Sequence, residues 1–269
     1  MKVLELVAPS EFVISEKQKP VPHPGEVLIK VACCGICGSD VHGMDNSSGR
    51  RIPPMIMGHE ASGVIEEVGA EVSGWSEGDR VSFDSMVYCG KCEHCERGET
   101  NLCHHRQVMG VSCQEFKRDG AFAEGVVVPS LILERIPEGL GFEEAAFTEP
   151  LAVALHAVNL VQVKKGERAL VVGSGLIGLL VIQALKRAGA GEVVAVDTDR
   201  KRLDLALKLG ATGAYTPDED SGDEFEIAME VVGAAPTLEK AVKSVRKGGR
   251  VGLVGNVVAE VPLALQWVV

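Results

Sequence analysis

Short apolar stretches separated by polar turns fill roughly the first 150 residues of the chain. The stretches are "KVLELV", "GEVLIKVACCG", "ASGVIEEVG", "GDRVSF" and "FAEGVVVP". Their lengths and apolar content are typical of strands, and Pro/Gly segments such as "PHPGE" and "RIPPM" break them apart. Few helical patterns interrupt this series. The sequence therefore predicts a mainly β domain over residues 1–152.

The pattern changes near residue 150, where "PLAVALHAVNLVQV" predicts a helix. The segment "KKGERALVVGSGLIGLLVIQALKRAGAGEVVAVD" then predicts a strand, a glycine turn, a helix and a strand. Helix patterns in "KRLDLALKLG" and "TLEKAVKSVRKGG" alternate further on with the strand patterns "GAYTP", "EIAMEVVG" and "RVGLVG". Alternating strands and helices indicate βαβ crossovers and a parallel sheet. Residues 153–269 are predicted to form an α/β, doubly wound Rossmann domain.

Composition narrows the class of protein. Hydrophobic residues make up 46% of the chain and charged residues 24%, as in ordinary globular proteins. The net charge of −11 disfavours nucleic acid or an anionic membrane surface as a partner. Strand-like sequence directly after Met1 predicts no signal peptide, and no apolar run is long enough for a membrane span. With eight cysteines, this predicts a cytoplasmic protein whose clustered thiolates hold zinc rather than form disulfides.

A glycine-rich turn is the first candidate binding site. Gly173, Gly175 and Gly178 in "VVGSGLIG" have the G-x-G-x-x-G spacing, directly after an apolar strand and at the start of a helix. The first glycine permits the turn, the second admits a pyrophosphate and the third allows close helix packing. Asp197 ends the next strand, 19 residues beyond Gly178, where it can bind an adenosine ribose and repel a 2′-phosphate. The predicted cofactor is NAD rather than NADP, although Arg200 lies nearby. The predicted cofactor-binding residues are Gly173, Gly175, Leu176, Ile177, Gly178 and Asp197.

Four cysteines gather in "YCGKCEHCERGETNLC", within a predicted zinc lobe at residues 86–106. Cys89, Cys92, Cys95 and Cys103 are separated by two, two and seven residues. Four thiolates complete a tetrahedral zinc shell and leave no position for a substrate, so this site is predicted to be structural. An iron–sulfur cluster is a weaker alternative for the same ligands. His94 lies inside the cluster, and we interpret it as a surface residue because a fourth thiolate is available.

A second set of candidate ligands is scattered along the chain. "GICGSDVH" contains Cys37, Ser39, Asp40 and His42, "MGHEASG" contains His59 and Glu60, and "FTEPLA" contains Glu149. Each is a weak signal alone, because single cysteines and histidines are more often structural. Sequence order by itself does not join them into a site.

Together these segments resemble the zinc-containing medium-chain alcohol and polyol dehydrogenases. "GHEASGVIEEVGAEV" is similar to the family signature, and "CGICGSDVH", the four-cysteine lobe and "VVGSGLIG" follow in the family's order. Glu149 in "EPLA", where other members have cysteine, is typical of the sorbitol, threonine and sugar-alcohol-phosphate branch. The resemblance covers essentially the whole chain. It implies a GroES-like catalytic domain followed by the Rossmann domain.

The resemblance also implies roles for individual residues. Cys37 and His59 would bind a catalytic zinc, with Glu60 and Glu149 competing for the third protein position. Such a zinc polarises the alcohol, Ser39 accepts its proton, and a relay through the nicotinamide ribose leads to His42, while NAD accepts the hydride. Asp40 would orient the ligands from behind. The implied substrate is a secondary alcohol of a polyol, a sugar alcohol or its phosphate, or an amino alcohol, and the implied assembly is a homodimer or homotetramer.

One departure from the family pattern concerns the end of the chain at "LALQWVV". Family members continue through a sixth sheet strand and a return to the catalytic domain, so we expect this sequence to be C-terminally truncated. Three alternative functions stay open. The chain could be a simple alcohol or diol dehydrogenase, or a non-catalytic nucleotide-binding or structural protein on the same scaffold. A zinc-finger nucleic-acid binder is disfavoured by the acidic charge and the lack of a basic helix.

Overall fold

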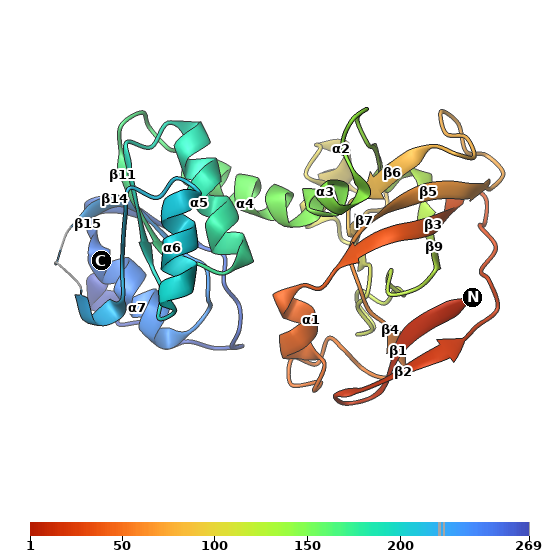
Figure 1. Cartoon of the computed structure of the whole chain (residues 1–269), viewed down its shortest axis with the longest axis horizontal. Coiled ribbons are helices and arrows are strands. Elements are labelled where there is room, and N and C mark those ends of the chain that lie inside the picture. The colour runs from red at the N-terminus through yellow and green to blue at the C-terminus, as the bar shows by residue number, and fades with distance from the viewer. Residues whose placement is uncertain (220–221, 223, 269) are drawn as a thin grey trace. The chain divides into compact units, whose positions relative to one another are not determined.

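The computed structural model describes residues 1–219, 222 and 224–268. It divides into two compact units, Met1–Glu149 and Pro150–Val269, which are described separately (Figure 1). Among the described residues, no helix has both the length and the apolar character needed to cross a membrane.

The first unit is built around a five-stranded sheet in which neighbouring strands run antiparallel. In sheet order its strands are β10 (Leu133–Arg135), β6 (Arg80–Phe83), β5 (Glu60–Val68), β3 (Glu26–Gly35) and β9 (Gly125–Pro129). Buried side chains such as Ile29, Ile65, Val81 and Val128 form the core of this unit. These strands show runs of buried residues rather than strict alternation, as at Val27, Leu28 and Ile29 in β3, so part of the sheet is buried on both faces.

Two smaller sheets and several short helices complete the first unit. A three-stranded sheet has the order β2-β1-β4, and a two-stranded sheet pairs β7 with β8. These strands are β1 (Lys2–Ala8), β2 (Glu11–Glu16), β4 (Met55–Ile56), β7 (Met86–Val87) and β8 (Gln107–Val108). The α-helices are α1 (Gly38–Gly43), α2 (Glu93–Glu96) and α3 (Phe142–Ala146), and 3₁₀ turns lie at η1 (Thr100–Leu102) and η2 (Ser130–Ile132).

The register between β3 and β5 positions one end of the candidate site. Two irregularities interrupt this pairing, between Leu28 and Ile29 and between Val31 and Cys33. Beyond them Gly35, the last residue of β3, lies opposite Glu60, the first residue of β5. The chain then leaves the sheet at Gly35 and enters α1, so that the two segments carrying "GICGSDVH" and "MGHE" meet.

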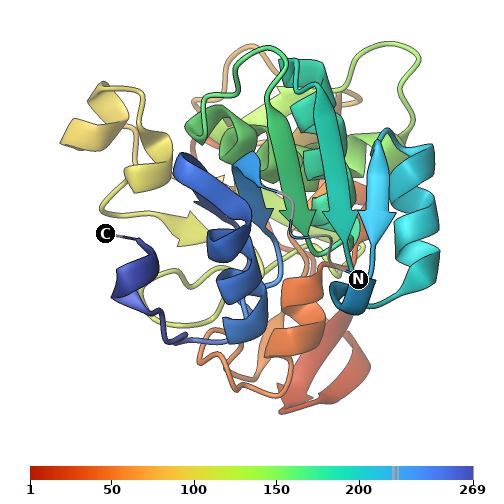
Figure 2. The same cartoon turned by 90° about the vertical axis from the view of Figure 1, so that its left-hand side faces the viewer.

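The second unit contains a five-stranded parallel sheet with the order β13-β12-β11-β14-β15. Its strands are β11 (Arg168–Val172), β12 (Glu192–Val196), β13 (Gly213–Tyr215), β14 (Phe225–Glu230) and β15 (Val245–Leu253). Its helices are α4 (Thr148–Leu160), which begins just before the unit boundary, α5 (Leu176–Ala188), α6 (Arg200–Lys208) and α7 (Ala235–Ser244). The 3₁₀ turns η3 (Pro217–Glu219) and η4 (Leu265–Trp267) complete it. Figure 2 shows the strands side by side with helices against them.

Helices cover both faces of the parallel sheet. In β11, Ala169 and Val171 pack in one core with α4, α5 and α6, whereas Leu170 and Val172 pack in a second core that includes Ala241 of α7. Adjacent residues of a strand point to opposite faces, so a strand buried on both faces reads as a continuous apolar run. The strand order, which reverses at β11, and the two covered faces confirm the predicted doubly wound Rossmann class.

One predicted boundary was wrong. The sequence predicts a helix over residues 237–249, but α7 ends at Ser244, and Val245 already belongs to β15. Gly248 has φ = +74°, outside the right-handed helical region, so the helix cannot continue through "RKGG". The pairing of β14 with β15 shifts register in this segment before it resumes at Ile227 and Arg250.

Candidate functional site

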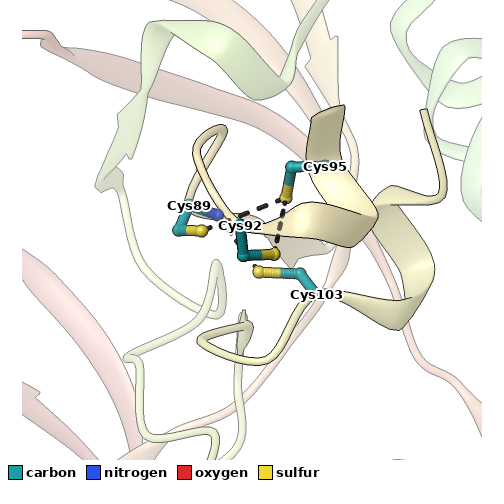
Figure 3. A group of neighbouring side chains, drawn as sticks. All are labelled: Cys89, Cys92, Cys95 and Cys103. Carbon is teal, nitrogen blue, oxygen red and sulfur yellow. Dashed lines mark hydrogen bonds between the residues drawn. The ribbon is translucent and has the colours of Figure 1, made fainter. Parts of the chain in front are cut away.

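The four cysteines of the lobe converge on one point (Figure 3). Their sulfurs all lie within 4.8 Å of one another. Cys92 Sγ is 3.5 Å from Cys95 Sγ, and Cys89 Sγ is 4.0 Å from the same atom. Four thiolates about 2.3 Å from a tetrahedral zinc stand roughly 3.8 Å apart, so these sulfurs fit a single ion.

Backbone N–H groups surround the same sulfurs. The amides of Cys89 and His105 donate to Cys103 Sγ at 3.3 and 3.4 Å. Backbone donors at Cys95 and His104 lower the pKa of Cys92 to about 5, whereas desolvation raises the pKa of Cys95 to about 11. Hydrogen bonds to a thiolate favour the charged form, so these backbone donors favour a thiolate at Cys92 in particular.

A second group joins Cys37, His59 and Glu60 in the first unit. Cys37 is the N-cap residue of α1, His59 precedes β5 and Glu60 begins it. One ligand atom from each of the three lies within 4.8 Å of the others. The structure thus brings together residues that are 22 and 23 positions apart in sequence, through the β3–β5 pairing described above.

The donor atoms of this group are buried and incompletely satisfied. His59 is 8% exposed and Glu60 is 4% exposed. His59 Nδ1 and Glu60 Oε1 have no hydrogen-bond partner among the described residues. Burial raises the pKa of Glu60, and it raises the pKa of the Cys37 thiol to about 11. Buried polar atoms without partners are costly, and a cation bound between them would satisfy them. A thiol, an imidazole and a carboxylate are also the ligand types of catalytic zinc sites.

Glu149 is held slightly apart from these three residues. Its carboxylate is not within the 4.8 Å group, and Oε1 accepts a hydrogen bond of 2.9 Å from Ser85 Oγ. Desolvation raises the pKa of Glu149, and the charges of His59 and Glu60 also act on it, which places it in their neighbourhood. Ser85 was not singled out from the sequence, because it is 64 residues away and part of no motif.

A buried ion pair lies behind the group. Asp40 Oδ2 accepts a hydrogen bond of 3.1 Å from the backbone N–H of Cys37, and Asp40 Oδ1 lies 3.6 Å from His59 Nδ1. This contact is longer than a hydrogen bond, so Nδ1 of His59 stays without a hydrogen-bond partner, and the carboxylate places negative charge beside the ring. Arg51 Nη2 contacts Asp40 Oδ1 at 3.4 Å, and both side chains are buried. Arg51 was missed in the sequence because nothing in its local pattern distinguishes it from Arg50.

Ser39 and His42 both lie on the exposed side of α1. Arg51 Nη2 donates a hydrogen bond of 3.3 Å to Ser39 Oγ. A guanidinium can only donate, so the serine oxygen accepts this bond and keeps its own proton available for another acceptor. Helix α1 therefore carries Ser39 and His42 on the same short element that begins at Cys37.

The glycine-rich turn in the second unit has room for a phosphate. Gly173 adopts φ = +102°, and a Cβ there would lie 2.6 Å from Val232 Cγ2. Gly175 is the N-cap residue of α5, and a Cβ at this position would meet no atom within 4 Å. A Cβ on Gly178 would overlap the carbonyl of Gly173. These three environments match the turn, the open cradle and the close packing that the spacing predicted.

Asp197 and the residues around the glycines define the rest of the turn. Asp197 Oδ2 accepts a hydrogen bond of 2.7 Å from Ser174 N, and Oδ1 accepts one of 2.9 Å from Asp199 N. Arg202 Nη1 lies 3.7 Å from Asp197 Oδ2. Leu176 is exposed at the start of α5, whereas Ile177 packs against the core. Asp197 is thus fixed beside the turn by backbone donors.

Comparisons with known proteins identify the family of each of the two domains. The family model for the alcohol dehydrogenase GroES-like domain matches residues 23–138, and that for the zinc-binding dehydrogenase domain matches residues 177–268. Sorbitol dehydrogenase of Bacillus subtilis is 36% identical over 251 residues, which cover 88% of this chain and 70% of that protein.

Two solved structures share the fold. Galactitol-1-phosphate dehydrogenase of Escherichia coli has a TM-score of 0.90 and 30% identity, covering 100% of this chain and 79% of the other. A zinc-binding dehydrogenase of Sinorhizobium meliloti, bound to NADP, has a TM-score of 0.89 and 31% identity, covering 99% and 80%. Both domain types, the fold and the level of identity agree. The chain belongs to the zinc-dependent, NAD(P)-dependent alcohol and polyol dehydrogenase family.

Proposed function

We propose that this protein oxidises a secondary alcohol of a polyol, or of a phosphorylated polyol, with NAD as the hydride acceptor. The observation that carries the proposal is the convergence of Cys37, His59 and Glu60, with buried donor atoms that lack protein partners. The substrate class is supported by the similarity to a sorbitol dehydrogenase and a galactitol-1-phosphate dehydrogenase.

Cys37 and His59 would be two of the ligands of a catalytic zinc. Glu60 lies within the same 4.8 Å group, whereas Glu149 is held by Ser85 in the neighbourhood, so Glu60 fits the third position in this arrangement. Glu149 would replace it only by leaving Ser85. A zinc here would supply Lewis-acid activation of the alcohol and would leave a coordination position open.

The protein's own residues would handle the proton. Ser39 Oγ accepts a hydrogen bond from Arg51 and is exposed on α1, so its remaining lone pair can accept the alcohol proton while Ser39 passes its own hydroxyl proton to a further acceptor. His42, one turn further along α1, is exposed and can pass a proton to solvent. Asp40 would place negative charge beside the ring of His59, which favours a cation in the group.

The preference for NAD rests on Asp197. Its carboxylate stands beside the glycine-rich turn and is held by the amides of Ser174 and Asp199. A negative charge in this position repels the 2′-phosphate of NADP and accepts hydrogen bonds from the ribose of NAD. Arg202, 3.7 Å away, partly offsets that charge, and one similar structure was solved with NADP, so the two coenzymes have to be compared directly.

The cysteine lobe would hold a second, structural zinc on Cys89, Cys92, Cys95 and Cys103. A tetrathiolate site has no open position, so it would stabilise the lobe and take no part in the reaction. Cytoplasmic location and assembly into a homodimer or homotetramer stay predictions from the sequence.

Substitution of Cys37 by serine tests the proposal. We expect Cys37→Ser to lose turnover and about one of two zinc ions per chain, because serine is a poor zinc ligand, while the thermal midpoint stays close to wild type. Cys33→Ser, a nearby half-buried cysteine outside both ligand groups, is the matched control and should keep activity and metal content. Zinc content by elemental analysis and NAD reduction with zinc-loaded protein are the measurements.

The substrate is identified by a panel of polyols, phosphorylated polyols, aliphatic diols and threonine, each assayed with NAD and with NADP. Oxidation of polyols or their phosphates with a larger kcat/KM for NAD supports the proposal. Turnover of only aliphatic diols, or of threonine, would overturn the substrate class. Full activity of Cys37→Ser would contradict the catalytic zinc.

A further inference from the structure

A third group of metal-binding side chains lies on the outer surface of the cysteine lobe. It consists of Glu93 and His94 in α2 and of His104, which directly follows Cys103. One donor atom from each lies within 4.8 Å of the others, and the two imidazole rings are 4.8 Å apart between centroids. None of these residues is among the ligands of the two sites described above, and none has a role in the reaction.

One ring nitrogen of His94 is already engaged by neighbouring side chains. Nδ1 lies 2.9 Å from Oε2 of Glu99 and 3.0 Å from Nη2 of Arg97, so Nε2 is the ring nitrogen left to bind a metal. Histidines that bind metals commonly use the second nitrogen in this way. His104 Nε2 lies 3.2 Å from Glu93 Oε1, which places the remaining imidazole and the carboxylate at contact distance before any ion binds.

The acidic side chains around this group favour a bound cation, but an arginine competes with that cation for them. Glu93 Oε1 contacts Nε2 of His104, and Glu99 Oε2 contacts Nδ1 of His94, so two acidic side chains lie at the imidazoles. Arg97 pairs with Glu99 at 3.0 Å and approaches Glu93 at 3.6 Å. This arginine is exposed, so its ion pair with Glu93 is weak and a bound divalent ion can displace it at low cost.

We propose that Glu93, His94 and His104 form a third metal site, exposed and exchangeable, for zinc or a similar divalent transition metal. Two imidazoles and one carboxylate suit zinc, nickel and copper(II), whereas magnesium and calcium require oxygen ligands. With three protein ligands on the surface, the remaining coordination positions are filled by water. The site therefore binds more weakly than the closed tetrathiolate.

Occupancy of this site affects the structural zinc. Glu93 and His94 lie between Cys92 and Cys95, and His104 lies next to Cys103, so the outer ligands alternate in sequence with the inner ones. An ion bound to the outer group joins the same two segments that the thiolates join. It therefore slows the opening of the lobe that releases the structural zinc.

A zinc titration tests the proposal. Purified protein is first dialysed against a weak chelator that leaves the two tight sites filled, and Zn²⁺ alone is then added while binding is followed by calorimetry. We expect about one further zinc per chain in the wild type and none in the double variant His94→Gln/His104→Gln. His105→Gln is the matched control, because His105 is an exposed neighbouring histidine outside the group.

Two further measurements test the third metal site even if the double variant does not fold. The ring proton signals of His94 and His104 should shift on addition of Zn²⁺ to the wild type while those of His105 do not, which needs no variant that might misfold. The thermal midpoint of the first unit should rise when Zn²⁺ is added to the wild type and should not rise in the double variant. The proposal is overturned if the wild type takes up no further ion, if the double variant takes up as many ions as the wild type, or if the histidine signals do not respond.

Discussion

At the scale of single residues, the buried charge pair behind the candidate zinc ligands matters most. Asp40 touches the backbone of Cys37 and the ring of His59, and Arg51 is the cation that balances its charge. A carboxylate in such a position needs a compensating partner, because removal from water is unfavourable for an isolated charge. The geometry of two proposed zinc ligands therefore depends on an arginine that would touch neither zinc nor substrate.

Replacement of this arginine should be strongly destabilising. In Arg51→Met the carboxylate of Asp40 stays buried without its cation, which costs about 3–5 kcal/mol. The exposed neighbour provides the control, since Arg50→Met should change the free energy of unfolding by less than about 0.5 kcal/mol. Urea unfolding of both variants measures the difference. Equal midpoints for the two would show that Arg51 does not compensate Asp40.

Whether the role of a single residue could be predicted depends on whether a sequence motif marks it or only contacts with residues distant in the sequence define it. The family resemblance implied Cys37 and His59 as ligands, with Glu60 and Glu149 competing for the third position, and the structure brings Cys37, His59 and Glu60 together. Arg51 and Ser85 were not predicted, because their roles arise from contacts with Asp40 and Glu149 that no local pattern encodes. Whether Glu60 or Glu149 binds zinc stays a prediction.

At the scale of secondary structure elements, two glycines of the same turn have different tasks. Gly178 packs helix α5 against the turn, and a Cβ there would overlap the carbonyl of Gly173, whereas a Cβ on Gly175 points into open space. A methyl group on Gly178 therefore disturbs the fold, whereas a methyl group on Gly175 disturbs only a bound ligand.

The corresponding alanine variants separate these tasks. Gly175→Ala should unfold at a midpoint near that of the wild type but bind NAD at least about tenfold more weakly, a loss of about 1.4 kcal/mol, because the methyl group occupies the phosphate cradle. Gly178→Ala should lower the unfolding midpoint itself, because α5 has to move. Thermal unfolding and NAD titration measure the two effects. A stable Gly178→Ala protein would contradict the packing role.

The 3₁₀ turn η3 is anchored by the carboxylate of Glu219, whose charge depends on pH. Glu219, in η3, receives hydrogen bonds from Arg200 at the start of α6 and from Thr216 after β13. The Arg200 bond is the main cause that lowers the pKa of Glu219 from 4.5 to about 2. Because the folded-state pKa is the lower one, the stabilisation is present above pH 4.5 and is lost as the pH falls toward about 2.

Substitution by glutamine tests this pH dependence. Glu219→Gln should be less stable than the wild type near neutral pH, and the difference should shrink as the pH falls from about 5 to about 2, where about half of the carboxylates are protonated. The effect is small because the ion pair is exposed. Urea midpoints of both proteins across this range measure it. A difference that does not change with pH would show that Glu219 acts only through neutral hydrogen bonds.

Elements were predicted best where one pattern dominates. The strands around the glycine-rich turn read as long apolar runs, and β11, β12 and β14 form where expected. The end of α7 was placed too late, since charged residues continue past Ser244 while the backbone at Gly248 does not stay helical. Two-residue strands such as β4 and β7 could not be predicted, because tertiary pairing alone defines them.

At the scale of the whole molecule, each unit has hydrophobic cores of its own. Side chains from Val27 to Leu133 form one core of the first unit, and those from Ala154 to Met229 form the main core of the second. Both candidate zinc groups lie in the first unit, and the glycine-rich turn lies in the second. Metal and nucleotide should therefore stabilise different parts of the protein.

Removal of zinc should reveal this division. Calorimetry with a strong chelator should lower the unfolding temperature of the first unit by many degrees and leave that of the second largely unchanged, since metal binding contributes folding free energy where it occurs. NAD at about 100 times its Kd should instead raise the second transition, by about 2.7 kcal/mol of added stability. A single transition that responds equally to both additions would show that the two units unfold together.

One consequence concerns Gly35, which lies opposite Glu60 where β3 meets β5. A Cβ on Gly35 would overlap the carboxylate of Glu60 and come within 3.2 Å of its Cβ, and the glycine has no positive φ that would itself exclude another residue. A residue that binds nothing thus sets the space available to a candidate ligand. A side chain at position 35 would displace the carboxylate of Glu60, so Gly35→Ala is expected to weaken or strengthen metal binding by the group while every proposed ligand stays in place.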